Sequence, residues 1–309
     1  MNGPQEAMIG RRLHLNHGPI DLVIEAFGET DATAAAYARA SARFSTILSE
    51  LVEELPALRE PSGSRPRPFR GSTACRMEAA VSPLARNGFI TPMAAVAGSV
   101  ADEILATMMS AGIDRAYVNN GGDCALFLSA GQVMQLAVAG TGRGMADRIA
   151  VRADDPVRGV ATSGWRGRSF SLGIADAVTV LARSAAAADA AATIVANAVD
   201  LPGHQAIRRE PANAMAPDTD LGDRLVTTGV GPLAEHEAAQ ALERGLAVAE
   251  TLRERGLIEA AGLFLAGDVR LCGGAFENVG APGDLAAGLP SPREVPLARP
   301  AHHLETQHA

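Results

Sequence analysis

The sequence lacks the basic charge that marks nucleic-acid-binding proteins. Its 27 arginine and lysine residues stand against 35 acidic ones, which gives a formal net charge of −8. A chain of this charge has no basic footprint for nucleic acid or for an anionic membrane surface. We therefore expect neither a nucleic-acid partner nor a membrane partner.

Long apolar runs are also missing. No stretch reaches the roughly 18 to 20 apolar residues that a membrane span needs, because charged residues such as Arg183 and Asp189 interrupt the best candidates. The first residues, MNGPQEAMIGRRLHLNHGPIDL, contain no apolar run long enough for the central region of a signal peptide. The sequence therefore predicts a cytoplasmic protein.

Cysteines are few, and the common catalytic motifs are absent. Cys75, Cys124 and Cys272 are far apart and have no C-x-x-C spacing, which argues against a disulfide framework or a zinc cluster. There is no G-x-S-x-G or H-E-x-x-H motif and no histidine between His17 and His204. A Ser-His or Cys-His pair in the centre of the chain would need a distant histidine.

The sequence does contain an alternation of strand and helix patterns that is typical of an α+β fold. We expect residues 132–139 to continue the main sheet, and residues 159–173, GVATSGWRGRSFSLG, to form a loop rich in glycine and serine. The patterns predict strands within residues 11–27, 115–128, 132–139, 148–154, 175–182 and 261–273, and helices at about 32–54, 91–112, 184–199 and 235–255.

The domain organisation follows from length and composition. We interpret residues 1–279 as one domain, with two interlocked lobes as the alternative. Residues 280–309, rich in proline and glycine, are expected to form a poorly ordered tail. The sequence does not fix the oligomeric state, and a homodimer stays open.

The alanine-rich segment 184–199, SAAAADAAATIVANAV, holds a single acid. Asp189, Thr193 and Asn197 follow one another at four-residue spacing, so they lie on one face of the predicted helix. A carboxylate on an otherwise apolar helix is costly to bury unless it is paired or coordinates a metal. The oxygens of Asp189 and Thr193 suit a small hard cation such as Mg²⁺.

Two alternatives to this metal site stay open. Asp189 is equally well explained by a structural ion pair with an arginine such as Arg168 or Arg183. The segment ADAVTV at residues 175–180 nearly repeats ADAAAT at residues 188–193, so the pattern also arises from packing. Asp176 in that near-repeat is a candidate for a second acid of the site.

A second candidate segment combines asparagines, glycines and an acid. Glycine pairs at strand ends expose N–H groups and let a ligand approach the backbone, and asparagine side chains can bind a base edge. A hairpin turn is the alternative, because Asn-Gly is a strong hairpin signal. The residues concerned are Asn119, Asn120, Gly121, Gly122 and Asp123.

A third candidate is the segment that begins at residue 162. Hydroxyls, glycine N–H groups and a guanidinium in one loop can cradle a phosphate, although the spacing is not that of a Walker loop. A polar surface loop is the alternative. Trp165 can stack on a planar ring or cover the edge of a core. The proposed cradle comprises Thr162, Ser163, Gly164, Arg168 and Ser169.

Taken in order, four segments resemble an uncharacterised cytosolic branch of the ApbE-like superfamily. They are FITPMAAVAGSVADEI, YVNNGGDCALFL, GVATSGWRGRSFSLGIADAVTVLA and AAADAAATIVANAV, and the resemblance covers about residues 10–270. ApbE proteins proper are FAD:protein FMN transferases, which bind FAD and Mg²⁺ in a central cleft of an α+β fold with mixed or antiparallel sheets flanked by helices. The resemblance implies that Asp189 and Thr193 help to hold Mg²⁺, and that the second and third candidate segments bind FAD or another phosphate-bearing small molecule.

The sequence departs from the transferases at two places. Their helix-entry loop, which resembles Ala95 to Gly98 here, usually carries lysine and glycine, where this chain has Ala97 in place of the lysine. After their serine-glycine motif they carry a histidine tied to catalysis, whereas residues 171–173 here are Ser, Leu and Gly. The resemblance therefore implies flavin-nucleotide binding and leaves FMN transfer open. The alternatives are a small-molecule enzyme or accessory factor in sulfur or amino-acid metabolism, and a non-catalytic nucleotide-binding module.

Overall fold

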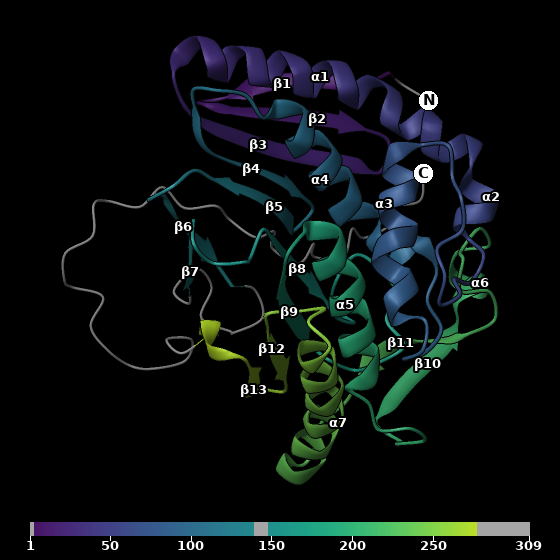
Figure 1. Cartoon of the computed structure of the whole chain (residues 1–309). Helices are drawn as coiled ribbons and strands as arrows, with labels where there is room; N and C mark the ends of the chain where they lie inside the picture. Colours follow the sequence, from purple (N-terminus) through teal and green to yellow (C-terminus); the bar gives the residue numbers. More distant parts are fainter. Residues whose placement is uncertain (1–2, 139–147, 277–309) are drawn as a thin grey trace.

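The computed structural model describes residues 3–138 and 148–276, and helices cover one face of a large sheet in it (Figure 1). Among these residues, nine strands form a sheet in the order β1-β2-β3-β4-β5-β8-β9-β12-β13, and every neighbouring pair is antiparallel. The prediction of an α+β fold with antiparallel sheets and flanking helices is confirmed. The strands are β1 (Gln5–Ile9), β2 (Arg12–His17), β3 (Ile20–Gly28), β4 (Ile113–Asn120), β5 (Asp123–Leu128), β8 (Gly159–Ser163), β9 (Ala177–Ala182), β12 (Ala260–Leu265) and β13 (Asp268–Cys272).

Two further sheets have two strands each. Strands β6 (Val133–Ala137) and β7 (Arg148–Arg152) pair with each other, and so do β10 (Ile207–Pro211) and β11 (Leu225–Val230). The prediction that residues 132–139 continue the main sheet is therefore wrong for β6. Alternation of apolar and polar residues along a strand indicates that one of its faces is buried, but it does not indicate which sheet the strand joins.

Three of the four predicted helices begin and end within two residues of their predicted bounds, and the fourth, predicted at 91–112, is shorter; three further helices, at 55–58, 72–81 and 212–215, were not predicted. The long helix α1 starts at Thr30 with six buried residues at helical spacing, and α4 follows a short 3-10 turn, η2, in which Thr91 Oγ1 accepts the Met93 N–H. Within the described ranges, no helix is both long enough and apolar enough to cross a bilayer. The helices are α1 (Thr30–Glu53), α2 (Leu55–Leu58), α3 (Ser72–Val81), α4 (Val96–Met108), α5 (Ala185–Ala198), α6 (Ala212–Met215) and α7 (Glu235–Glu254), and the 3-10 turns are η1 (Ser82–Leu84), η2 (Pro92–Ala95) and η3 (Gly274–Phe276).

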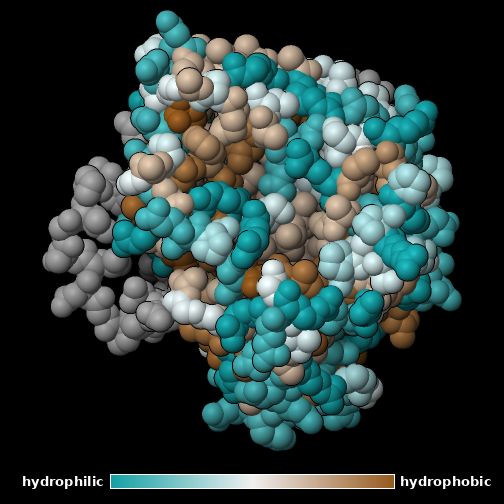
Figure 2. Space-filling model, in the orientation of Figure 1, coloured by the Kyte–Doolittle hydropathy of each residue, from teal (hydrophilic) through white to brown (hydrophobic). Residues whose placement is uncertain are grey.

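Three apolar clusters hold the layers together. One lies between α1, α4 and strands β2 to β4, and a second packs α5 and α7 against β9 and β12. The third packs β6 and β7 against the main sheet. On the face shown in Figure 2, apolar atoms appear between hydrophilic side chains rather than as one continuous surface.

The two halves of the main sheet meet at a short contact between β5 and β8. Only two residue pairs, Cys124 with Val160 and Ala125 with Gly159, are in register there. Gly159 has no Cβ, which would stand 2.0 Å from the carbonyl carbon of Ser184. The prediction of a loop over residues 159–173 is thus wrong for β8, because contact with α5 and β9 orders a segment of weak strand propensity.

Candidate functional site

Helix α5 leaves one polar stripe accessible. Nine of its residues are buried, and seven of these are alanines, whereas Asp189, Thr193 and Asn197 are partly exposed. Ser184 caps the helix by accepting the Ala187 N–H at 3.2 Å. The accessible stripe of α5, defined by these three residues, is the face predicted from their spacing.

Helices α4 and α5 lie side by side (Figure 1) and approach through Gly98. A Cβ on Gly98 would stand 2.2 Å from the carbonyl oxygen of Ala185. At this contact the Gly98 N–H donates to Asp189 Oδ2 at 3.0 Å, and the Ala97 N–H also donates to the carboxylate. Asp102 completes the contact by accepting the N–H groups of Ala185 and Ala186 at 3.0 and 2.9 Å. The direction of Asp189 is therefore fixed by backbone groups.

Residues 119–123 form a tight hairpin between β4 and β5. Gly121 and Gly122 have φ values of +66° and +126°, in the region that favours glycine. Asn119 Oδ1 accepts the Gly122 N–H at 2.9 Å, and Asn120 Nδ2 donates to the Ala97 carbonyl at 3.1 Å. The turn alternative thus describes the local structure, and Asn120 ties this turn to the backbone that holds Asp189.

Asp123 and Asp189 come together as a pair of acids. Asp123 is buried on β5, where its Oδ1 accepts the Thr162 N–H at 3.2 Å. Burial raises the pKa of Asp123 to about 7, although Thr162 and Arg168 oppose the shift. Burial and then the charge of Asp123 raise the pKa of Asp189 well above its ordinary value. Two close carboxylates repel each other unless a proton or a cation lies between them.

Arginines do not neutralise Asp189 within the part of the chain that the structure describes. Arg183 pairs with Glu259 at 3.2 Å, and no cationic side chain lies within 4 Å of Asp189 among the described residues. Arg168 lies over the hairpin, since a Cβ on Gly121 would stand 1.6 Å from its guanidinium nitrogen Nη2. The ion-pair alternative is therefore not the arrangement seen.

The donor set near Asp189 consists of oxygens. Carboxylates and hydroxyls are the ligands that hard cations such as Mg²⁺ prefer, and Mg²⁺ usually keeps several waters or substrate oxygens. In residues 3–138 and 148–276 there is no group of three or more His, Cys, Asp or Glu side chains that would complete a site alone. The residues present fit a cation whose remaining ligands are hydroxyl, carbonyl, water or phosphate oxygens.

The third candidate segment leaves the sheet at Ser163 and turns outward. The Thr162 hydroxyl lies 2.9 Å from that of Thr179, while Ser163 is partly exposed and Ser169 is exposed. Gly164 passes so close to Asp176 that a Cβ would stand 2.7 Å from the Asp176 carbonyl oxygen. Arg168 therefore lies close enough to Asp123 to act on its pKa, and Ser163 and Ser169 are accessible on the same loop, whereas the Thr162 hydroxyl is already engaged.

Asp176 supports the loop, and it is not the second acid of the pair. Its Oδ1 accepts the indole N–H of Trp165 at 3.2 Å and Nε–H of Arg166 at 2.5 Å. Its Oδ2 accepts the Ala266 N–H at 2.8 Å. The second acid is Asp123, which the sequence placed in the hairpin without linking it to Asp189.

Residues 171–173 hold no histidine and are fixed in place. Ser171 Oγ and the Leu172 N–H donate to Asn197 Oδ1 at 3.3 and 2.9 Å. The Thr227 N–H donates to the Ser171 carbonyl at 2.9 Å. This segment therefore offers a rigid wall at the end of the stripe and no imidazole base.

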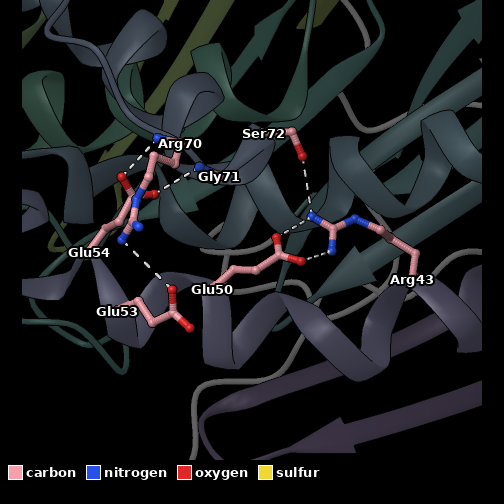
Figure 3. Close-up of a pocket in the computed structure, with 7 residues that line it drawn as sticks. All are labelled: Arg43, Glu50, Glu53, Glu54, Arg70, Gly71 and Ser72. Carbon is pink, nitrogen blue, oxygen red and sulfur yellow. Dashed lines mark hydrogen bonds and ion pairs between the residues drawn. The ribbon is translucent and has the colours of Figure 1, made fainter.

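A separate pocket lies between α1 and α3, and neither acid of the pair lines it (Figure 3). Arg43 pairs with Glu50 at 2.7 Å, and Glu54 accepts the N–H groups of Arg70 and Gly71, each at 2.8 Å. Its charged groups thus satisfy one another. We assign the candidate site to the acid pair and not to this pocket.

Comparisons with known proteins add a family. The family model described as "AbpE bacteria" matches residues 5–271. A UPF0280 protein of Methanothrix thermoacetophila is 40% identical over 111 residues, which cover 36% of this chain and 46% of that protein. A UPF0280 protein of Methanoregula boonei is 33% identical over 148 residues, covering 46% and 61%. The chain spans about half the length of the curated relatives it matches.

Solved structures with a similar backbone arrangement include one named "Flavin Transferase ApbE from Vibrio cholerae". It is 13% identical, covers 89% of this chain and 99% of its own, and has a TM-score of 0.48. The apo form of a flavinyl transferase ApbE from Pseudomonas stutzeri is 15% identical, with a TM-score of 0.40 and coverages of 90% and 98%. Likenesses this remote carry no argument about the activity of this chain.

Proposed function

Because the chain belongs to the family described as AbpE bacteria, within the ApbE-like superfamily, we propose that it binds a flavin nucleotide together with a divalent cation. The observation that carries the proposal is the acid pair, in which the charge of Asp123 raises the pKa of Asp189 while no cationic side chain lies within 4 Å of Asp189 among the described residues. The ApbE-like superfamily, whose flavin transferases bind FAD, supplies the ligand class.

Each residue of the site has a role in this proposal. Asp189, Asp123 and the Thr193 hydroxyl would hold the cation, and the N–H groups of Ala97 and Gly98 keep Asp189 oriented toward it. Arg168 and Ser163 would meet phosphate oxygens. A bound Mg²⁺ would neutralise charge on those oxygens.

Binding without FMN transfer is the form of the function that the site supports best. Transfer to a serine or threonine needs a base that takes the proton from the acceptor hydroxyl. The position of the family's histidine is filled by Ser171 to Gly173, whose polar groups are engaged with Asn197 and Thr227. We therefore expect a protein that holds its nucleotide intact.

The test is a titration of the purified chain with FAD, followed by flavin fluorescence, with Mg²⁺ or with EDTA. We expect saturable binding that EDTA weakens and that Asp189→Asn weakens by about tenfold or more. Asp114→Asn, a change of an exposed acid at the start of β4, is the matched control. The proposal fails if FAD does not bind, or if neither EDTA nor Asp189→Asn changes the affinity for FAD.

A second readout tests FMN transfer. The chain is incubated with FAD, Mg²⁺ and a bacterial lysate, and proteins are then searched for covalent flavin by in-gel fluorescence. We expect FAD to remain intact and no labelled protein to appear. A labelled protein that depends on this chain would show that it is a transferase in spite of the missing histidine.

A further inference from the structure

The aromatic side chains of this protein can all be accounted for. The sequence has eight Phe, two Tyr and one Trp, and all of them lie within the described residues. Phe44, Tyr117, Phe264 and Phe276 are buried in the apolar clusters. Tyr37 and Phe127 are partly buried and pack against the cluster beneath α1 and α4. These six rings are part of the cores.

Four of the remaining rings carry an arginine on one face. The guanidinium carbons of Arg115, Arg67 and Arg224 lie 4.4, 5.6 and 3.4 Å from the ring centroids of Phe27, Phe69 and Phe89, respectively. Arg166 covers Trp165 in the same way at 4.7 Å. Trp165, the ring that the sequence singled out for stacking, is thus covered on one face and held at its indole N–H by Asp176.

Phe170 is the ring that remains. It is partly exposed, and among the described residues it packs against none of the three apolar clusters and has no arginine over it. With respect to the described residues, this partly exposed phenyl ring, which is neither core nor covered by a cation, has a face available to a planar ligand.

The loop around Phe170 is fixed at both sides of this residue. Two positions earlier, Arg168 lies over Gly121 beside the acid pair. One position later, Ser171 bonds to Asn197 on α5 and to the backbone of Thr227. The backbone at Phe170 therefore runs from a residue beside the acid pair to a residue bonded to Asn197, and Asp189 and Asn197, the two ends of the accessible stripe of α5, are about 12 Å apart at the rise of an α-helix.

We propose that Phe170 is the stacking platform for the ring of the bound nucleotide, and so determines ring specificity in the site. This rests on the proposed function: the cation and phosphates lie at Asp189, and the ring lies toward Asn197. The stripe is long enough to separate the two parts of one nucleotide. Pyrophosphate, which has no ring, would make only the contacts with the cation at Asp189 and with Arg168 and Ser163.

The test compares ring-bearing and ringless ligands by calorimetry in the presence of Mg²⁺. The ligands are FAD, ADP and inorganic pyrophosphate. We expect Phe170→Leu to weaken FAD and ADP by about tenfold, in line with stacking on an aromatic ring, and to leave pyrophosphate unchanged. Phe170→Tyr keeps a ring and should retain the affinity of the wild type. Phe69→Leu, at a partly exposed ring far along the chain from the loop, is the matched control.

Several outcomes would overturn the proposal. Unchanged FAD and ADP affinity in Phe170→Leu would exclude a stacking role, and an equal loss for pyrophosphate would show a structural role instead. If the wild type binds ADP but not FAD, the flavin function fails, while the effect of Phe170→Leu on ADP still decides the stacking role. If the wild type binds neither, both proposals fall.

Discussion

Gly98→Ala sets two physical effects against each other. Alanine is more favourable than glycine by about 1 kcal/mol in a helix interior and by less in the first turn, where Gly98 lies, so helix propensity predicts a slightly more stable protein. A Cβ at this position would however stand 2.2 Å from the carbonyl oxygen of Ala185 and 2.4 Å from its carbonyl carbon. Ordinary contact begins at 3.4 Å, so α4 and α5 must separate by about 1 Å.

The separation has a magnitude that can be worked out. Overpacking of this kind costs about 1–3 kcal/mol. It also lengthens the bonds from Asp102 to the start of α5, whose loss as a helix cap costs about 1 kcal/mol. After the gain in propensity, the free energy of unfolding should fall by about 2 kcal/mol.

The measurement is urea unfolding followed by circular dichroism, with Gly245→Ala in α7 as the comparison. A Cβ on Gly245 would stand 2.3 Å from Val199 Cγ2 and 2.8 Å from Leu263 Cδ2, which are ends of side chains that can rotate away. Gly245→Ala should therefore be less destabilised than Gly98→Ala. A Gly98→Ala protein at least as stable as the wild type would refute this account of the helix contact.

Three further predictions concern other parts of the chain. Burial raises the pKa of Glu78, but hydrogen bonds, chiefly from Arg67, lower it below its ordinary value. The ionised Glu78 carboxylate therefore stabilises the folded protein above the pKa that Glu78 has in the unfolded state. This stabilisation is lost as the pH falls through the pKa of Glu78 in the folded state. The free energy of unfolding of Glu78→Gln should be about 3 kcal/mol lower than that of the wild type at neutral pH, and it should fall less on acidification. Urea unfolding of both proteins at neutral and at acidic pH measures this. Asp102→Ala removes the acceptor for two N–H groups of α5 and should cost about 1 kcal/mol in thermal unfolding; an unchanged midpoint would contradict this. Thr91→Val removes the bond to Asp220 at 2.5 Å and should speed hydrogen exchange at the Ala212 and Asn213 amides, whereas equal exchange would show that this bond does not hold the loop.

Much of the fold could be predicted from local sequence patterns. The spacing of Ala36, Ala40, Phe44 and Ile47 defines α1, and the run around Gly121 and Gly122 defines a hairpin. These signals are local because the residues of one helical face or one turn are close in sequence. Strand β8 was not predicted, because its glycine and hydroxyl residues favour loops and form a strand here only where they are buried beside α5.

The candidate site could be predicted only in part. The spacing of Asp189 and Thr193 pointed to one face of a helix, which the structure has. The partner of Asp189 is Asp123, and the two acids are far apart in sequence and meet only after the sheet and α4 have packed. Asp176 has the same local pattern as Asp189, yet its bonds to Trp165 and Arg166 give it a supporting role. Such pairings are set by topology and not by propensity.

The short contact between β5 and β8 has a consequence for how the molecule opens. Strands β5 and β8 pair through two residue pairs only, so this part of the sheet is weakly held together. Strands β1 to β5 should therefore form one cooperative unit in native-state hydrogen exchange, and strands β8, β9, β12 and β13 a second one. Asp123 belongs to the first unit and Asp189 to the second. A cation bound by both acids would link the two units, and the cation-bound protein would then unfold as a single cooperative unit.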